Sequence, residues 1–245
     1  RKIDNDYWVK QDTGSGLDYL EGYNNNFVYY ENIIAAYMMA GNQVGNFGWQ
    51  LGVRSEYSDI TTELLKTDYK NQRDYLNFFP SAHFSFKVGE LNSLQASYSS
   101  RIQRPWFRRL MPFSSFTNSR NIWGGNPDLN PEYTDSYELG YLLNWESGSL
   151  LSNVYYRHST DIIQSVTYID SIGITQIRPS NIGIQNSLGI EFNLSQDIAK
   201  WWSTTANFNF FTSKITGNET VYNLNTEYES WNTRVSSKMN YSGYN

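Results

Sequence analysis

Apolar and polar residues alternate one by one through long segments of this chain, and few segments follow the 3.6-residue period of a helix. In residues 81–88, for example, Ala82, Phe84 and Phe86 alternate with small or polar residues. Successive side chains of a strand point to opposite faces, so the pattern predicts strands with one apolar and one polar face. About nine such strands are predicted, at residues 27–40, 47–57, 81–88, 94–102, 136–145, 150–157, 187–194, 204–211 and 231–241.

The predicted strands are joined by connections that alternate strictly between short and long. Short turns fall at residues 41–46, 89–92, 146–149 and 195–203, and long connections at 58–80, 103–135, 158–186 and 212–230. An up-and-down barrel in the outer membrane has this alternation, with short periplasmic turns and long extracellular loops. A Greek-key sandwich has no reason to show it. The predicted fold is therefore all-β, an antiparallel up-and-down transmembrane β-barrel.

Charge is confined to one face of the eight predicted strands whose two faces can be assigned; residues 27–40 have ambiguous parity. A charged side chain facing lipid costs about 2–4 kcal/mol at the bilayer midplane, so a membrane barrel keeps such residues off its lipid side. Residues that alternate onto the polar face are expected to line the lumen or contact a plug. The candidates are Arg54, Glu56, Arg101, Glu138, Arg157, Glu191 and Arg234.

Composition supports a barrel with one apolar and one wet face. Aromatic residues make up 17% of the chain and charged residues 18%, yet the mean hydropathy is polar at −0.59. The net charge of −5 includes no basic stripe, so nucleic acid is not expected as a partner. The absence of cysteine excludes disulfides and thiolate metal sites. No apolar run approaches the roughly 20 residues of a transmembrane helix.

The predicted strands do not make a complete barrel. Nine is an odd number, whereas single-chain bacterial barrels use even numbers of strands. Residues 1–26 contain many turn formers and are expected to be a loop or the end of a preceding strand. The whole chain, residues 1–245, is therefore interpreted as part of one barrel domain, with about nine strands in residues 27–245. A plug domain and the closing strands are expected to lie outside it.

Residues 97–141 contain three motifs in order: Arg104-Pro105 at a strand end, the loop segment 125–132 (Gly-Asn-Pro-Asp-Leu-Asn-Pro-Glu) and a Tyr-Glu-Leu-Gly strand at 137–140. In this, the chain resembles the barrel of TonB-dependent outer-membrane receptors. Residues 30–37 and 52–57 resemble further segments of that barrel. The loop segment is interpreted as a rigid turn rather than a ligand contact, because each Asn-Pro pair forces the chain out of the α region.

The resemblance implies a 22-stranded barrel in the bacterial outer membrane, filled by an N-terminal plug. It implies import of a scarce ligand such as siderophore-iron, cobalamin, a glycan or a peptide. The expected partners are outer-membrane lipid, the plug and remaining barrel strands, TonB through the missing plug, and a small ligand.

The long connection at 103–133 is the candidate site for a ligand or partner, because large exposed side chains on loops often bind one. Packing within the loop or on the barrel rim is an equally open interpretation. The candidates are Trp106, Phe107, Arg108, Arg109, Phe113, Phe116 and Trp123.

No residue pattern indicates catalysis. The two histidines, His83 and His158, have no converging nucleophile and carboxylate in the sequence, and no phosphate loop or metal-ligand spacing is present. The chain is therefore expected not to be an enzyme and to need no cofactor or metal.

Three functions remain in competition. The first is a ligand importer. The second is a non-transporting outer-membrane barrel that acts as a scaffold, adhesin or assembly partner. The third is a soluble β domain that binds carbohydrate through its aromatic side chains, since a β-sandwich also alternates in polarity.

Overall fold

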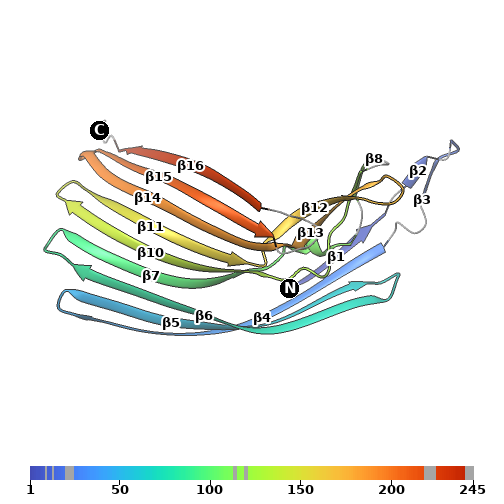
Figure 1. Cartoon of the computed structure of the whole chain (residues 1–245), viewed down its shortest axis with the longest axis horizontal. Coiled ribbons are helices and arrows are strands. Elements are labelled where there is room, and N and C mark those ends of the chain that lie inside the picture. The colour runs from blue at the N-terminus through green and yellow to red at the C-terminus, as the bar shows by residue number, and fades with distance from the viewer. Residues whose placement is uncertain are drawn as a thin grey trace, which may run out of the picture.

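A computed structural model describes residues 1–8, 10–12, 14–19, 25–112, 115–118, 121–217 and 225–240. Ten strands form one antiparallel sheet in the order β1-β4-β5-β6-β7-β10-β11-β14-β15-β16, so each strand lies beside the next one of this set along the chain. Figure 1 shows the sheet curving as a single layer with the short turns at one end. The strands are β1 (Lys2–Tyr7), β4 (Asn25–Val44), β5 (Phe47–Leu64), β6 (Tyr69–Lys87), β7 (Asn92–Gln103), β10 (Glu132–Trp145), β11 (Gly148–Thr160), β14 (Gly183–Ala199), β15 (Trp202–Gly217) and β16 (Asn225–Met239).

Each of the nine predicted strands is present, and the sheet adds β1, which pairs with the first residues of β4. The four short connections are present as expected, and long connections follow β7 and β11. Several strands, however, run far beyond their predicted ends. Most of the long connection predicted at residues 58–80 is strand, because β5 and β6 stay paired from Ile60 and Arg73 up to Leu64 and Tyr69. This long loop is therefore an extended hairpin.

The cross-strand register places side chains on two faces of opposite character, because directly paired residues point to the same side. One row joins Leu51, Ala82, Tyr98, Tyr137 and Tyr156 across five strands. We call this side the outer face. The adjacent rows carry polar residues and form the inner face, on which the row next to the first joins Gln50, His83, Ser97, Glu138 and Tyr155.

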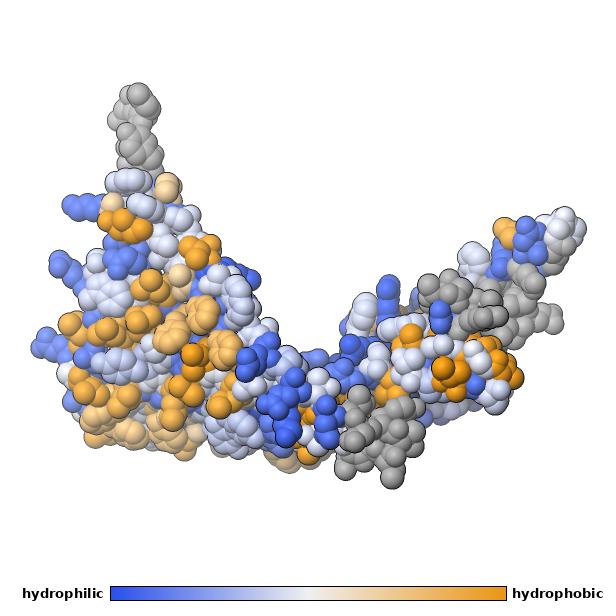
Figure 2. Space-filling view, turned by 45° about the horizontal axis from the view of Figure 1, so that its top comes forward, coloured by the Kyte–Doolittle hydropathy of each residue, from blue (hydrophilic) through white to orange (hydrophobic). Residues whose placement is uncertain are grey.

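The apolar part of the outer face has the height of a membrane. On β5 it runs from Phe47 to Tyr57 and ends at Asp59. At about 3.3 Å per residue and a tilt of about 45°, this stretch rises about 23 Å, close to the roughly 25 Å apolar band of outer-membrane barrels. We call the part of the sheet at this height the membrane band. Figure 2 shows hydrophobic side chains gathered over the short-turn half of the molecule and a hydrophilic zone beyond them.

The part of the chain beyond the membrane band folds differently. Its long connections contain the small sheet β12-β13-β9-β8, the hairpin β2-β3 and one short helix. Phe27 and Tyr29 at the start of β4 pack there with Leu110, Leu129 and Ile163, all buried. We call these five residues the loop core. The elements are α1 (Phe107–Leu110), β2 (Lys10–Asp12), β3 (Leu17–Tyr19), β8 (Ser115–Asn118), β9 (Asn121–Trp123), β12 (Ile163–Ile169) and β13 (Thr175–Asn181).

The large sheet is not half of a sandwich. Its outer face leaves large apolar side chains exposed, among them Leu139 and Val154, and the element contacts of the described residues include no second sheet pressed against it. The sheet remains open between β1 and β16. Within the described residues, no helix has the length and apolar character needed to span a bilayer.

Candidate functional site

The seven residues predicted to face the lumen all lie on the inner face. Six of the nine long strands supply them, and the register places several beside polar or small neighbours such as Ser136, Ser187 and Asn207, whereas Arg54 pairs with Tyr37 and Phe79. They are Arg54 and Glu56 on β5, Arg101 on β7, Glu138 on β10, Arg157 on β11, Glu191 on β14 and Arg234 on β16.

On the inner face, at the end nearest the long connections, a buried carboxylate lies between two arginines. Glu56 Oε1 is 3.0 Å from Arg54 Nε, and Glu56 Oε2 is 2.6 Å from Arg104 Nη2. The side chains of Glu56 and Arg104 are only 8% and 17% exposed. Arg104 also donates to the Ser58 hydroxyl at 2.7 Å and to the Tyr75 hydroxyl at 3.2 Å. A buried ion pair needs additional hydrogen bonds to offset the cost of removing water from its charges, and these contacts supply them.

Arg104 was not among the predicted lumen residues. It lies just beyond β7, where strand alternation no longer defines a face. The available signal was its position before Pro105, since a residue before proline is held extended. An arginine fixed in this way at a strand end can reach back to the neighbouring strands.

A second cluster lies around Glu138 on the inner face, nearer the short turns. Arg157 approaches it, with Nη2 3.9 Å from Glu138 Oε1, and also lies 4.1 Å from the centre of the Tyr155 ring. Tyr155 is buried and donates to Asn209 Oδ1 at 2.9 Å. Its ring covers Gly189, the residue directly opposite, where a Cβ would meet the ring. The glycine therefore makes room for the tyrosine, a cross-strand pairing that supports sheets at glycine positions.

Amide side chains surround the charges of the last strands. Glu191 Oε1 accepts from Asn207 Nδ2 at 2.7 Å and from Asn193 Nδ2 at 3.1 Å. Arg234 lies directly opposite Asn207 and is exposed. The inner face therefore carries hydrogen-bond donors and acceptors, with charges of both signs, rather than a concentration of one charge.

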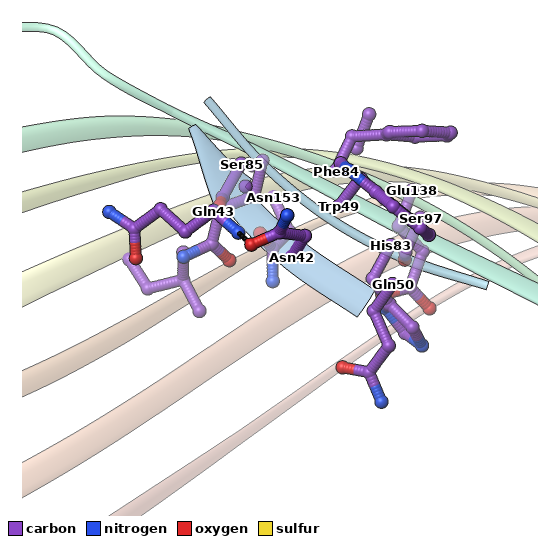
Figure 3. Close-up of a pocket in the computed structure, with 15 residues that line it drawn as sticks. Asn42, Gln43, Trp49, Gln50, His83, Phe84, Ser85, Ser97, Glu138 and Asn153 are labelled. Carbon is purple, nitrogen blue, oxygen red and sulfur yellow. Dashed lines mark hydrogen bonds between the residues drawn. The ribbon is translucent and has the colours of Figure 1, made fainter. Parts of the chain in front are cut away.

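A hollow of about 470 Å³ opens on the inner face near the short-turn end. Figure 3 shows the side chains of Gln50 and His83 lying together at one side of it, with Gln43 at the other. Glu138 and Asn153 also line it. Such a surface suits contact with water or with the polar backbone of a filling domain.

The candidate loop has one anchored and several exposed residues. Phe107 packs against the loop core and lies 6.5 Å from the Tyr29 ring, and burial raises the pKa of Tyr29 so that it stays neutral. Trp106 and Trp123 are exposed, and Arg108 stacks on Trp106 at 5.0 Å. Arg109 is exposed as well. Phe113 lies outside the described residues, and only the backbone of Phe116 is described.

The loop segment 125–132 fastens several outside elements together. Asn126 donates to the Pro179 carbonyl of β13, while Arg73 of β6 donates to the Leu129 carbonyl at 2.9 Å and pairs with Asp128 at 3.0 Å. These contacts tie the segment to β6 and to β13. This is the behaviour of a rigid turn.

A second hollow, of about 500 Å³, lies outside the membrane band beside this segment. The tip of the β5–β6 hairpin contributes Tyr69, the loop contributes Pro112 and Asp128, and β13 contributes Arg178. Arg178 is exposed and has no ion pair among the described residues.

The two histidines lie on opposite faces of the sheet. His83 is on the inner face beside Ser97, and His158 is on the outer face beside Asp135. The described part of the chain contains no cluster of three metal-binding side chains.

Comparison with known proteins gives a family and a fold. A family model described as the outer membrane protein beta-barrel family matches residues 1–243. The search of curated proteins gave no match.

Several solved structures share the fold. The chain is 14% identical to the siderophore receptor PirA from Pseudomonas aeruginosa (TM-score 0.55), covering 87% of this chain and 50% of that one. It is 13% identical to the hemophore receptor HasR from Serratia marcescens (TM-score 0.61), covering 92% and 42%. It is 14% identical to the ferric yersiniabactin uptake receptor FyuA from Yersinia pestis (TM-score 0.58), covering 96% and 35%. The chain therefore spans half or less of the length of these structures.

Proposed function

The chain belongs to the outer membrane protein beta-barrel family of the bacterial outer membrane, and from this premise we propose that it forms part of the wall of a TonB-dependent transporter. The transporter would take up a scarce ligand of the siderophore-iron, cobalamin, glycan or peptide class. The motifs in residues 97–141 support the receptor type, and the fold shared with uptake receptors agrees with it.

The observation that carries the proposal is the contrast between the two faces of the sheet. The outer face is apolar through the membrane band, whereas the inner face has the buried ion pair Glu56–Arg104 and exposed polar groups such as Gln50 and Arg234. Charges and amides on a lumen face suit contact with a plug and with a polar ligand passing it.

The outside elements support a role in capturing the ligand. They are held in place by the loop core and by the segment 125–132, yet they leave Trp106, Trp123 and Arg178 exposed. Rigid exposed aromatic side chains bind ligands at low entropic cost. In this proposal the plug and TonB act through further parts of the transporter, and the chain itself performs no catalytic step.

The proposal is tested by uptake in cells that express the complete natural protein. Labelled ferric siderophores, cobalamin, oligosaccharides and peptides are supplied to cells with the gene, without it, and with the gene but without TonB. We expect one ligand class to accumulate only when both proteins are present and the proton-motive force is intact.

Trp106→Ala and Trp123→Ala should each lower uptake at subsaturating ligand by several-fold. Trp231→Ala is the matched control, because its indole lies on the outer face of β16 and meets lipid. If no ligand class depends on the protein and TonB, the transporter proposal fails and a scaffold or adhesin takes its place.

A further inference from the structure

The hollow of about 500 Å³ beside the segment 125–132 combines apolar walls with one arginine. Leu64, Tyr69 and two prolines, Pro112 and Pro127, line it. Leu64 pairs with Tyr69 at the tip of the β5–β6 hairpin and with Phe27 of the loop core, and all three are on the inner face. The hollow therefore lies on the side of the outside elements that is turned toward the lumen.

Arg178 brings a positive charge to this hollow from β13. The residue directly opposite it on β12 is the apolar Val166, and its neighbours two positions away along β13 are Gln176 and Ser180. Arg178 is exposed, and its guanidinium group forms no ion pair in the part of the chain that the structure describes. A guanidinium group carries five donors in a fork that matches the oxygens of an anion. Arg178 can therefore bind an anion without breaking an internal ion pair.

The backbone beside Arg178 is held in place by the segment 125–132. Asn126 donates to the Pro179 carbonyl at 3.1 Å. The Asn181 side chain accepts from the Asn130 N–H at 2.8 Å and donates to the Asn130 carbonyl at 2.9 Å. The arginine and the prolines of the hollow are thus fixed relative to each other before any ligand arrives, which lowers the entropic cost of binding.

The acidic residue among the described residues that line the hollow is Asp128, and it is already engaged. Its Oδ1 accepts from Arg73 Nη2 and from Asn71 Nδ2, each at 3.0 Å. The charge of Arg178 is therefore left for a ligand. The Asp128 side chain is nevertheless 70% exposed, so its negative charge still acts on the hollow. It repels an anion with two charges more strongly than an anion with one.

We propose that the hollow binds a carboxylate of the transported ligand against Arg178, with an apolar ring or chain of the ligand against Tyr69 and Pro127. This inference rests on the proposed function and narrows it, because it makes the ligand an acidic molecule rather than a neutral one. Arginine holds a carboxylate through two parallel hydrogen bonds. Apolar walls with one well-placed charged group are typical of small-molecule sites. A carboxylate is favoured over a phosphate because Asp128 lies in the same wall.

Fluorine NMR of the complete natural protein in a nonionic detergent tests this site. The probes are para-fluorobenzoate, para-fluorophenyl phosphate and the neutral para-fluorobenzamide, each titrated separately. We expect the benzoate to bind more tightly than the other two. Arg178→Gln should weaken benzoate binding at least about tenfold, which corresponds to about 1.4 kcal/mol. Arg178→Lys should keep part of the affinity, because it retains the charge but loses the paired hydrogen bonds.

Lys70→Gln is the matched control, because it removes one positive charge near the tip of the same hairpin. Lys70 pairs with Glu63 on the outer face and does not line the hollow. Its removal should leave benzoate binding unchanged. Heat-modifiable migration shows that all three variants have folded.

Equal benzoate binding by the Arg178→Gln and Lys70→Gln variants would overturn the proposal. So would benzamide binding as tight as that of benzoate, and tighter binding of the phenyl phosphate would overturn the choice of a carboxylate. Uptake distinguishes this failure from that of the proposed function. If a ligand accumulates through TonB equally with Arg178 and with Gln at this position, transport stands and the hollow does not. If benzoate binding depends on Arg178 but no ligand accumulates, the hollow stands and transport does not.

Discussion

The membrane band and the outside part of this chain satisfy opposite requirements. In the outside part, apolar side chains are buried against each other, and Leu129 is only 3% exposed. In the membrane band, residues of the same kind lie on the surface, and Leu139 is 66% exposed. Both regions are β-rich and both are made by the same long strands, β4 to β6 among them. What differs is the solvent, since water forces a core to form and hydrocarbon does not.

The difference shows that an exposed apolar side chain is not by itself a sign of poor packing. Large exposed apolar surfaces mark interfaces in soluble proteins. On this sheet they coincide with the height of a bilayer and end where Asp59 and Asp74 pair across β5 and β6. The loop core begins beyond that row, where Phe27 pairs with Leu64. The fold therefore changes from a lipid-supported to a self-supported structure along the same strands.

The largest expected effect comes from shortening one leucine in each region. Leu129→Ala removes a buried side chain from the loop core and should cost about 2–5 kcal/mol of local stability. Leu139→Ala, on the outer face, leaves no cavity because lipid fills the space, and should cost less than about 1 kcal/mol. Protease sensitivity of the outside elements at constant heat-modifiable migration measures the first effect. Equal sensitivity of the two variants would contradict the comparison.

A smaller effect is expected when a charge is placed on either face of β14. Ile190→Arg puts a guanidinium group on the outer face in the row of Leu139 and Val154, and should cost about 2–4 kcal/mol near the midplane. Asn193→Arg points to the inner face among amides and should assemble nearly normally. The folded fraction of each variant after insertion is read from heat-modifiable electrophoresis. Similar folded fractions would mean that the two faces have been assigned wrongly.

The sequence predicted the faces well where one side meets lipid and the other water. Alternation in hydropathy is clear only where the two faces meet surroundings of opposite polarity, and so the extensions of β5 and β6 beyond Asp59 were missed. There one face of β5 packs against the loop core with apolar Ile60 and Leu64 but also with the buried, polar Thr62, so the pattern fades while the strand continues.

Strand β4 had no clear parity for a different reason. It carries Tyr37 and Met39 on its inner face as well as Ile34 and Met38 on its outer face. No rule based on alternation can separate two apolar faces, and only pairing with Arg54 and Val53 of β5 decides which is which. The inner-face cluster was predicted only in part. Alternation identifies Glu56 and Arg54, whereas Arg104 contacts Glu56 from a position beyond the end of a strand, where alternation gives no information.

Adding one methyl group to a glycine should have a moderate effect that also separates the regions. At Gly125 a Cβ would meet the Met111 carbonyl and come within 2.6 Å of the Arg109 carbonyl, which are backbone atoms and cannot turn away. Gly125→Ala should therefore cost about 1–3 kcal/mol and loosen the outside elements. At Gly48 the nearest atom is the Ser85 hydroxyl oxygen, which can rotate. Gly48→Ala should be nearly neutral, and hydrogen exchange of residues 103–132 distinguishes the two.

The smallest expected effect is a pH dependence confined to the outside part. Backbone N–H groups of Ile174 and Ile172 donate to Asp170 in the β12–β13 turn, and these bonds hold the pKa of the Asp170 carboxyl below its usual value. A lowered pKa means that the folded turn favours the ionised group. The stabilisation is fully present at a pH above the unfolded-state pKa of about 3.9, and it is lost as the pH falls through the pKa of the folded turn.

Acidification to about pH 3 should therefore lower the protection factors of the β12–β13 hairpin of the natural protein, that is, its amide exchange rates relative to those of an unfolded chain at the same pH. Asp170→Asn should show faster exchange already at neutral pH and little further change on acidification, because an amide accepts these bonds more weakly and does not titrate. The membrane band around Leu139 serves as the internal reference. Acid-induced exchange there of the same size would mean that the whole sheet responds to pH, and the separation between a lipid-supported and a self-supported region would not hold.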